Sequence, residues 1–492
     1  MAIRTIGAAS VMRDLGRWRD EGDAGGRPGA RPAYVALAEG IRLLIHDGRV
    51  ALGVALPSER DLAATLDLSR TTVTSAYALL RERGYLISRQ GSRSTVALPP
   101  GVKPTGVSLM AGIATPDTLT VDMTYAAMDA PAGVHEAYHL AVQGLAPYLG
   151  THGMDPVGLP VLREAIARRY TERGLRTDPD QILVTLGAQH ALRLLLNVVA
   201  APGERVLIDH PTYPNAIEAI RGGGARPVPV ALRPEDPSCG WDLDGVRSAA
   251  RQTAATAAYL VPDFNNPTGL VLDDAGRAEL AAIARETRMT VIIDESMSDL
   301  ALDVPTPTPV ACFATGAEVV TVGSMSKSFW GGLRVGWVRA PRSVIAKLLG
   351  TRVAMDLGTP PIDQLACAEL LRDPAPIIAL RCDELRERRA ALRGALASEL
   401  PDWEPVAGAG GMALWVQLPA PVSTALAATA PNHGVLLAAG PRFGVQGAFE
   451  RFLRLPYTHP APDLRLAVSG LATAYAALGP RTTAPLAPLA VV

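Results

Sequence analysis

From about residue 121 to about residue 480, short apolar runs rich in β-branched side chains alternate with longer stretches of helical character. The runs are Ile182–Thr185, Arg205–Asp209, Ala258–Val261, Thr290–Asp294 and Val319–Val322. Apolar runs of this length, separated by helical segments, are typical of buried parallel strands that are connected by helices. The pattern therefore predicts an α/β fold with a largely parallel sheet covered by helices.

A different pattern precedes it, over residues 31–98. An amphipathic helix, a short helix capped by Ser58 and a third helix capped by Ser69 are expected, followed by two short strands around Gly91. The apolar positions expected to face inward are Leu37, Ile41, Leu44 and Ile45 of the first helix and Val73, Tyr77 and Leu80 of the third. This order of elements predicts an α+β winged helix-turn-helix domain.

Glycines and prolines mark the remaining boundaries. Residues 1–30 end in a Gly- and Pro-rich stretch and are expected to form a flexible arm, and residues 99–120 are expected to form a linker because their prolines and glycines disfavour a helix. The predicted large domain then spans residues 121–480, and the Ala- and Pro-rich residues 481–492 are expected to be a frayed tail.

Composition narrows the class of protein. At 492 residues, two or more domains are expected, and a net charge of −1 implies no global electrostatic partner. No apolar run reaches the ~18–20 residues that a bilayer requires, and the N-terminus has no apolar signal region. The four cysteines are scattered and the histidines show no metal-ligand spacing, so we expect free thiols in a cytoplasmic protein without a metal site.

Lysine is rare in this chain. Of the 47 Lys and Arg residues only Lys103, Lys327 and Lys347 are lysines, so Arg fills nearly every ordinary cationic position. A primary amine can form a Schiff base with an aldehyde, which a guanidinium cannot. Lys327 lies among small hydroxyl residues, glycines and Arg334, and these flanks indicate an anchor for pyridoxal phosphate (PLP).

PLP needs a carboxylate at its ring nitrogen, an aromatic at its ring face, a donor at its 3-oxygen, and a helix N-terminus with an arginine at its phosphate. Candidates occur in a suitable order: Gly187, Ala188 and Gln189 at a helix start, then Tyr213, Asn266, Asp294, Ser324, Ser326 and Arg334. Each also has a structural interpretation when taken alone. Gly187 could form a simple strand-to-helix turn, Tyr213 could be a loop aromatic, Asn266 could belong to a turn, and Asp294 could pair with a structural arginine.

The winged helix offers candidates for DNA contact. The third helix would enter the major groove with Arg70, Thr71 and Thr72 near bases or phosphates. The residues expected along the DNA backbone are Arg60 and the wing residues Arg89, Gly91 and Arg93. Residues 31–98 hold nine Arg against six Asp or Glu, a balance of +3. The alternative is a small helical cap with a solvated Arg face.

Two runs in this unit carry a family resemblance. Leu56-Pro-Ser-Glu-Arg-Asp-Leu-Ala63 and Ser69-Arg-Thr-Thr-Val-Thr-Ser-Ala-Tyr77, with Gly84-Tyr-Leu86 following, resemble the signature of the GntR-family winged helix. The resemblance implies DNA binding.

The stretch from about 150 to 460 resembles the fold type I aminotransferases, through the run Gly153–Arg163, Pro211-Thr-Tyr-Pro214, Asn265-Asn-Pro-Thr-Gly269 and the segment from Ser324 to Trp337. The resemblance implies that Lys327 carries PLP as an internal aldimine. It also implies that Asp294 faces the ring nitrogen, Asn266 meets the 3-oxygen, Tyr213 stacks and Arg334 holds the phosphate. A late arginine of this family receives a substrate carboxylate. Arg454 is the candidate here, with Arg451 as its competitor and a plain surface arginine as the remaining alternative.

One position departs from that family. Two or three residues after the aspartate the family usually carries a tyrosine that shares the 3-oxygen, and here Ser296 or Met297 stands in its place. Losing the phenol should leave PLP binding mostly intact but weaken proton transfers. The departure argues against an efficient transaminase.

Taken together, the two units resemble the MocR-type subfamily of GntR regulators, which implies a homodimer that binds repeated promoter sequences. PLP at Lys327, alone or with an amino compound, is expected to change DNA binding. The rival hypotheses are a working aminotransferase with an added DNA-binding module, and a sensor of PLP alone.

Overall fold

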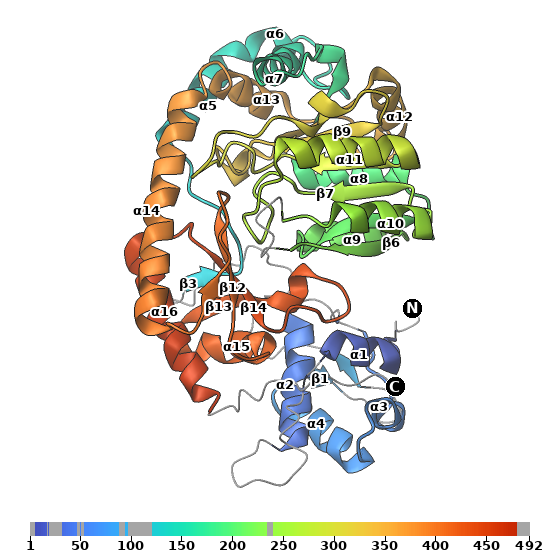
Figure 1. Ribbon diagram of the computed structural model, residues 1–492, viewed down its shortest axis with the longest axis vertical. Coiled ribbons are helices and arrows are strands. Elements are labelled where there is room, and N and C mark those ends of the chain that lie inside the picture. The colour runs from blue at the N-terminus through green and yellow to red at the C-terminus, as the bar shows by residue number, and fades with distance from the viewer. Residues whose placement is uncertain are drawn as a thin grey trace.

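The computed structural model describes residues 5–16, 18, 32–46, 50, 54–87, 94–96, 121–233 and 240–479. Figure 1 shows a small N-terminal unit, drawn in blue, and a larger body that contains two sheets. None of the helices in the described ranges is long and apolar enough to cross a membrane.

The N-terminal unit contains the predicted helices and strands. They are α2 (Ala33–His46), α3 (Glu59–Leu66), α4 (Arg70–Glu82), β1 (Leu86–Ile87) and β2 (Thr95–Val96). The Ser58 hydroxyl accepts a hydrogen bond from Asp61 N at 3.1 Å, and the Ser69 hydroxyl accepts one from Thr72 N at 3.1 Å, so both predicted N-caps are confirmed. All seven apolar positions predicted to face inward are buried in one cluster, and β1 pairs antiparallel with β2.

Part of the predicted flexible arm is a helix. Residues Ala8–Leu15 form α1, and Val11 and Leu15, one helical turn apart, are buried in the cluster shared with α2, α3 and α4. The apolar stripe of α1 therefore stabilises this segment by packing. The tip of the wing, the predicted linker and the predicted tail lie outside the described residues.

The larger sheet has seven strands in the order β4-β10-β9-β8-β7-β5-β6. They are β4 (Ile182–Thr185), β5 (Arg205–His210), β6 (Arg226–Ala231), β7 (Ala257–Leu260), β8 (Thr290–Asp294), β9 (Val319–Ser324) and β10 (Gly336–Arg339). The pairs among β6, β5, β7, β8 and β9 are parallel, whereas β10 is antiparallel to both its neighbours. The five predicted strands and the largely parallel sheet are confirmed.

Helices cover both faces of this sheet. Leu207 and Val291 pack in one cluster with α10 (Leu243–Thr253) and α11 (Asp274–Thr287). The next residue of each strand, Ile208 and Ile292, packs in another cluster. The helices of that second cluster are α8 (Ala188–Val199), α9 (Pro214–Gly222) and α12 (Arg342–Arg352). Because successive strand residues point to opposite faces, the continuous apolar runs fill both layers.

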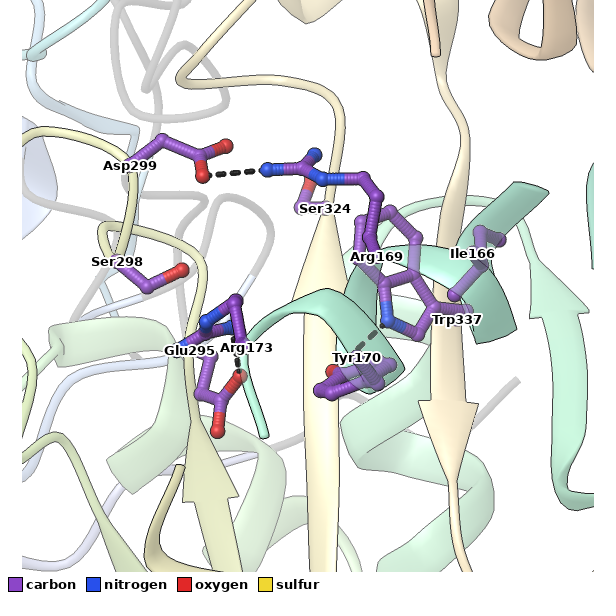
Figure 2. A pocket seen from close by; sticks show the side chains of 9 residues that line it. All are labelled: Ile166, Arg169, Tyr170, Arg173, Glu295, Ser298, Asp299, Ser324 and Trp337. Carbon is purple, nitrogen blue, oxygen red and sulfur yellow. Dashed lines mark hydrogen bonds and ion pairs between the residues drawn. The ribbon is translucent and has the colours of Figure 1, made fainter. Parts of the chain in front are cut away.

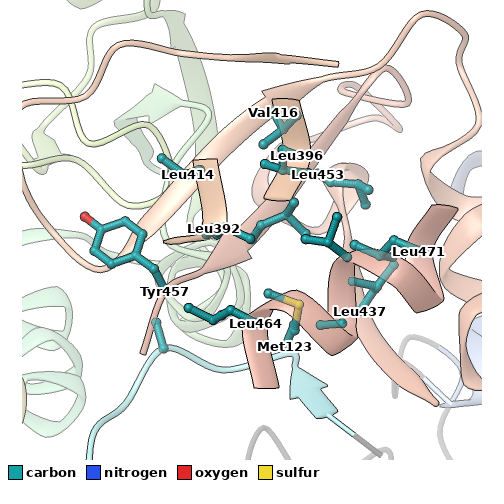
Figure 3. Packing of buried hydrophobic residues seen from close by; sticks show 14 of the residues in the cluster. Met123, Leu392, Leu396, Leu414, Val416, Leu437, Leu453, Tyr457, Leu464 and Leu471 are labelled. Atoms are coloured by element: carbon teal, nitrogen blue, oxygen red, sulfur yellow. The ribbon is translucent and has the colours of Figure 1, made fainter. Parts of the chain in front are cut away.

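A second sheet has the order β11-β12-β14-β13-β3. Its strands are β3 (Val121–Met123), β11 (Glu404–Pro405), β12 (Ala413–Gln417), β13 (Val435–Ala439) and β14 (Phe452–Pro456), and its helices are α14 (Ala375–Glu399), α15 (Ser423–Thr429) and α16 (Ala461–Ala477). Figure 3 shows Leu392 and Leu396 of α14 packed against Leu414, Leu453 and Leu464. This sheet brings β3, the first described strand after the predicted linker, next to β13.

The remaining helices pack together in a third cluster of the large body. They are α5 (Ala132–Gly144), α6 (Ala146–Leu149), α7 (Pro160–Glu172) and α13 (Pro361–Leu370). Figure 1 shows them at the end of the molecule far from the N-terminal unit.

Candidate cofactor site and DNA-binding surface

The candidate residues gather at one edge of the large sheet. Asp294 ends β8, and Lys327, Asn266 and Tyr213 follow β9, β7 and β5. These four strands are parallel neighbours in the sheet, so their carboxyl ends lie side by side. A crevice outside the carboxyl ends of the strands is where open α/β sheets bind ligands.

Lys327 has an unusual environment for a lysine. Its Nζ donates to the carbonyl oxygen of Ala126 at 2.8 Å. Burial, followed by the positive charge of Arg454, lowers the pKa of Lys327 to about 8, while Asp294 acts in the opposite direction. A lysine with this pKa is partly neutral near physiological pH, which is the form that attacks an aldehyde.

Asp294 is held by hydrogen-bond donors. Its Oδ2 accepts from the phenol of Tyr259 at 2.6 Å and its Oδ1 accepts from Ser296 N at 2.8 Å, and the residue is 8% exposed. Among the described residues, no Arg, Lys or His nitrogen lies within 4.0 Å of this carboxylate. The alternative that Asp294 pairs with a structural arginine therefore finds no support among these residues. Tyr259 was missed from sequence because it lies inside a buried strand, where an aromatic is ordinary.

Arg334 lies across the start of α8. Its Nη2 donates to the carbonyl oxygen of Leu186 at 3.2 Å, and a Cβ built on Gly187 would lie 3.0 Å from that nitrogen. Gly187 is the N-cap of α8, with φ +85°, and no side chain caps this helix start. A Cβ on Gly336 would lie 2.6 Å from the Gly187 carbonyl carbon, so glycine is required there for β10 to approach. The uncapped amides of Ala188 and its neighbours, beside a guanidinium, suit a phosphate.

The ring-facing candidates lie close to this edge. Tyr213 is half-buried, and its pKa is raised by burial and then by Asp294, so the two side chains are electrostatic neighbours. Its hydroxyl accepts from Asn215 Nδ2 at 3.0 Å. Gln189 donates to Asn215 O at 3.2 Å, and its buried Oε1 has no partner among the described residues.

The two asparagines after β7 have different surroundings. Asn265 is buried, donates to Asp209 at 3.3 Å and accepts from the Thr268 hydroxyl at 3.0 Å. Asn266 is half-buried, and its side chain makes no hydrogen bond to the described residues. Asn266 is therefore the one that is free to meet a ligand.

Ser324 is placed apart from this group. Its hydroxyl accepts from Ser326 N at 3.1 Å, and it lines a small cavity of about 20 Å³ together with Arg169, Arg173 and Glu295 (Figure 2). A cavity of this size holds about one water. Ser326 is half-buried next to Lys327.

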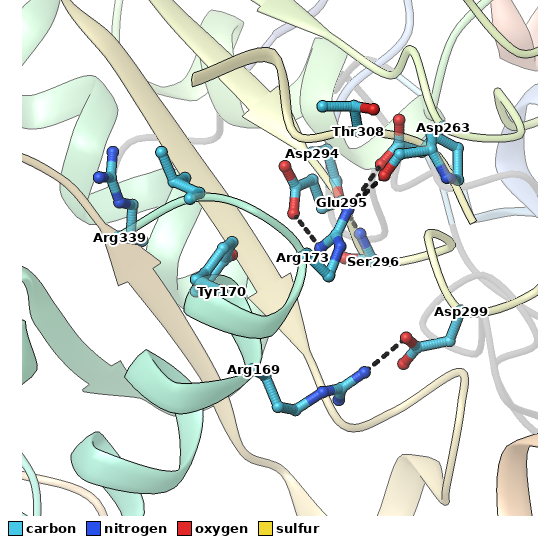
Figure 4. A network of polar contacts seen from close by, with 12 residues as sticks. Arg169, Tyr170, Arg173, Asp263, Asp294, Glu295, Ser296, Asp299, Thr308 and Arg339 are labelled. Atoms are coloured by element: carbon cyan, nitrogen blue, oxygen red, sulfur yellow. Dashed lines mark hydrogen bonds and ion pairs between the residues drawn. The ribbon is translucent and has the colours of Figure 1, made fainter. Parts of the chain in front are cut away.

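Ion pairs whose side chains are at most 18% exposed brace the segments that carry Asp294 and Lys327. Arg173 pairs with Glu295 at 2.8 Å, and Arg169 pairs with Asp299 at 2.6 Å, as Figures 2 and 4 show. Asp299 also accepts from the hydroxyl of Ser328 at 2.6 Å. Arg173, the residue after α7, thus holds Glu295, which directly follows Asp294. Arg169 of α7 holds Asp299, which in turn holds Ser328, the residue after Lys327.

Ser296 and Met297, the two residues that could take the place of the family tyrosine, have different surroundings. Met297 is 7% exposed and packs with Phe264 and Leu300 in the cluster of the second sheet. The hydroxyl oxygen of Ser296 is buried without a partner among the described residues.

Arg454 and Arg451 have clearly different positions. Arg454 is buried on β14, donates to Thr124 O at 2.5 Å and has a buried Nε without a partner among the described residues. Burial and the neighbouring Arg442 lower the pKa of Arg454 to about 10. Arg451 is exposed and donates to Pro419 O at 2.6 Å. Of the two, Arg454 is the electrostatic neighbour of Lys327.

The exposed face of α4 is small and polar. Arg60 of α3 and Arg70 and Thr71 at the start of α4 are exposed, whereas Thr72 is half-buried and its amide is capped by Ser69. The same face of α4 also exposes Thr74, Ser75 and Ala78. Sequence reasoning missed these three, although helical spacing from Arg70 and Thr71 could have found them. Arg89, Gly91 and Arg93 lie outside the described residues.

The fold and the gathered residues define a PLP-binding protein of the aminotransferase class joined to a winged helix-turn-helix. Residues 130–471 match the family model of aminotransferase class I and II, and residues 33–96 match that of the bacterial regulatory proteins of the gntR family. The chain belongs to the MocR-type regulators, in which these two domains are fused.

Similar proteins include both regulators and enzymes. The uncharacterized HTH-type transcriptional regulator YdcR of Escherichia coli (strain K12) is 30% identical over 448 residues, covering 86% of this chain and 94% of that one. The arginine–pyruvate transaminase AruH of Pseudomonas aeruginosa is 32% identical over 337 residues, covering 67% of this chain and 83% of that one. The solved structure of the α-aminoadipate aminotransferase LysN from Thermus thermophilus, complexed with N-(5'-phosphopyridoxyl)-L-leucine, has a TM-score of 0.67 and 27% identity, covering 73% of this chain and 92% of that one.

Proposed function

We propose that this chain is a transcriptional regulator in which PLP held at Lys327, alone or with an amino compound, changes how a homodimer binds promoter DNA. The observation that carries the proposal is the position of Lys327 in the loop after β9, beside the strand that ends at Asp294, in a chain that also has a GntR-type domain. When bound, PLP supplies an aldehyde that links covalently to amines.

The residues present fit that group. The unpartnered Gln189 Oε1, the uncapped start of α8 and the free side chain of Asn266 are polar atoms that a bound ligand would satisfy. In this proposal Lys327 anchors PLP, Asp294 holds the ring nitrogen, Tyr213 stacks on the ring and Asn266 donates to the 3-oxygen. Arg334 and the amides of α8 hold the phosphate, and Ser326, next to Lys327, also contacts PLP. Arg454 receives the carboxylate of an amino compound.

A homodimer is supported by exposed apolar side chains. Val142 is 63% exposed, Leu149 74%, Val353 66% and Leu357 57%, and a partner subunit that covered them would remove this apolar surface from water. A two-fold dimer would present two winged helices to repeated promoter sequences. Because such a regulator must meet chromosomal DNA, we place its action in the cytoplasm.

DNA contact is proposed for the exposed face of the N-terminal unit. Arg60 and Arg70 are exposed cations, and Thr71 stands beside Arg70 at the start of α4. Thr72 lies in the same first turn of α4 and is half-buried. We propose that these residues, together with the wing residues Arg89, Gly91 and Arg93, bind the duplex.

The second candidate function is a working aminotransferase. It is favoured by the presence together of Lys327, Asp294, Arg334 and Arg454. It is disfavoured by the lack of the family tyrosine, since Ser296 or Met297 stands where that phenol would share in proton transfer. Residual transaminase activity is compatible with the regulator.

The test measures DNA binding of the full-length protein against PLP concentration, with and without added amines, for the wild type and Lys327→Ala. We expect wild-type DNA affinity to change as PLP binds, and the variant to stay folded but unresponsive. A response to PLP without amine identifies a PLP sensor, and an added response to amines identifies the amine-sensing form. Equal DNA binding with and without PLP at every salt concentration would refute the proposal. Single-turnover conversion of bound PLP to its amine form would favour the enzyme instead.

A further inference from the structure

Asp209 extends the link between β5 and β7 toward the cofactor site. It lies on β5 and is 1% exposed, and Tyr213 follows in the loop after this strand. The last backbone pair between β5 and β7 is Ile208 with Tyr259. One residue further along β5, Asp209 Oδ2 accepts from Val261 N, just beyond β7, at 2.7 Å. The carboxylate thus continues the connection after the ladder of backbone bonds has ended, at the edge where the candidate residues gather.

The same oxygen holds the turn that carries Asn266. Asp209 Oδ2 also accepts from Asn265 Nδ2 at 3.3 Å. Asn265 in turn closes its own turn, because its Oδ1 accepts from the Thr268 hydroxyl at 3.0 Å and its carbonyl oxygen accepts from Gly269 N at 2.6 Å. Asn266, the next residue of the chain, is therefore placed by a turn that is anchored to β5.

A third donor completes the surroundings of this carboxylate. Asp209 Oδ1 accepts from the indole nitrogen of Trp241, which is 5% exposed, at 2.9 Å. No Arg, Lys or His nitrogen in the described part of the chain lies within 4.0 Å of Asp209. Burial raises the pKa of Asp209 to about 6, and the three donors oppose that rise. Because donors meet both oxygens, they fix the direction of the carboxylate and with it the spacing of the two loops that it joins.

We propose that Asp209 is a positioning residue of the cofactor site, which keeps Asn266 within reach of the 3-oxygen of PLP while Tyr213 stacks on the ring. Asp209 touches no ligand in this proposal and acts through Asn265. The inference deepens the proposed function and rests on it, because both place PLP at Lys327. A donor that must meet a ligand atom to within about 0.5 Å needs support of this kind from the residues behind it.

The first experiment follows the visible spectrum of bound PLP against pH in the full-length protein. In Asp209→Ala the midpoint should rise by about one pH unit, because a 3-oxygen that loses the Asn266 donor holds a proton more tightly. The dissociation constant for PLP should rise about tenfold. Asp209→Asn turns one acceptor oxygen into a donor, so it should move both quantities in the same direction, and it serves if the alanine variant does not fold.

Two controls separate positioning from a general loss of stability. In the Asn266→Ala background, replacing Asp209 should leave the midpoint where Asn266→Ala alone puts it, since the route of its effect has been removed. Leu280→Ala is the matched structural control, because Leu280 is 1% exposed and packs in the same cluster as Trp241. It should destabilise the fold and leave the midpoint unchanged.

A second measurement needs no PLP. Hydrogen exchange of the peptide that contains Val261 and Asn265, followed by mass spectrometry on the PLP-free protein, should be faster in Asp209→Ala than in Leu280→Ala. The inference would be overturned by a wild-type midpoint in both Asp209 variants, by an undiminished shift in the Asn266→Ala background, by an equal shift in Leu280→Ala, or by equal exchange in the two alanine variants. Failure of the proposed function is a separate result: PLP binding that leaves DNA affinity unchanged.

Discussion

Tyr259 on β7 donates its phenolic hydrogen to the Asp294 carboxylate on the adjacent strand β8, over 2.6 Å. Tyr259 is fully buried, and its pKa is raised well above the ordinary value by burial and then by Asp294, so it remains a donor at all physiological pH. The bond fixes the direction in which the Asp294 carboxylate faces. In the proposed site that direction determines how well the carboxylate meets the ring nitrogen.

Tyr259→Phe should weaken PLP binding. Removing the hydroxyl leaves Asp294 with the Ser296 amide as its remaining donor among the described residues. A hydrogen bond to a charged group contributes about 1.5–3 kcal/mol, so the dissociation constant for PLP should rise about tenfold or more. Equilibrium titration of the visible absorbance measures it.

Tyr457→Phe is the matched control, since Tyr457 is equally buried but donates to Gly410 O at 3.3 Å, away from Asp294. Its PLP affinity should be that of the wild type. Equal PLP affinity in both variants would mean that Tyr259 does not position Asp294.

Covalent attachment of PLP should depend on pH with a midpoint near the pKa of Lys327, about 8. Below that pH the ammonium predominates and has no lone pair, so the attachment rate should rise about tenfold per pH unit and then level off. Stopped-flow absorbance on the PLP-free protein measures the rate. A rate that keeps rising beyond pH ~10 would show that Lys327 has an ordinary pKa.

The same pKa shift has a consequence for stability. Between pH 8 and the ordinary lysine pKa of 10.5, the unfolded chain keeps a proton on Lys327 that the folded chain has lost. The PLP-free protein should therefore gain stability as pH rises through this window. Urea unfolding at a series of pH values measures the gain, and Lys327→Met, which has no titrating amine, should lack this contribution.

Arg70→Ala should weaken binding to duplex DNA and lower its dependence on salt. Arg70 is exposed at the N-terminus of α4, and each phosphate contact adds about 0.9 to the slope of log K against log salt. We expect the slope to fall by about one in fluorescence anisotropy titrations. Arg221→Ala, an exposed arginine of α9 paired with Glu218, should leave the slope unchanged. An unchanged slope in Arg70→Ala would show that Arg70 makes no phosphate contact in the complex.

Glu295→Gln should destabilise the fold. It leaves Arg173 with Asp263 at 3.9 Å as its nearest carboxylate among the described residues, and breaking a buried pair costs about 3–5 kcal/mol. Urea unfolding measures the loss. Glu218→Gln, in an exposed pair, should change the free energy of unfolding by less than about 0.5 kcal/mol. A similar small effect at Glu295 would mean that water already solvates the pair.

Much of this fold could be predicted because its signals are local. Apolar runs give the strands of the large sheet, and Ser58 and Ser69 mark the helix starts that the structure has. The candidates Lys327, Asp294 and Tyr213 could be grouped because parallel strands end at a common edge. Their individual roles at PLP remain predictions.

What could not be predicted depends on contacts between distant segments. Tyr259 reaches Asp294 from a neighbouring strand, and the ring of Phe443 reaches the Arg454 guanidinium from a separate turn. The burial of Val11 and Leu15 likewise required knowledge of where α1 packs, since a helix of eight residues is marginal without its partners.

The segment after β3 is tied down by the cations of the site. Thr124 O accepts from Arg454 and Ala126 O accepts from Lys327, three and five residues beyond the start of β3 at Val121. A ligand that claims the hydrogens of Lys327 and Arg454 takes them from these two carbonyls. The segment after β3 is thus held by the same two cations that are proposed to hold the ligand. In the proposed function, loading the site would free the segment after β3 directly, without a relay through the interior.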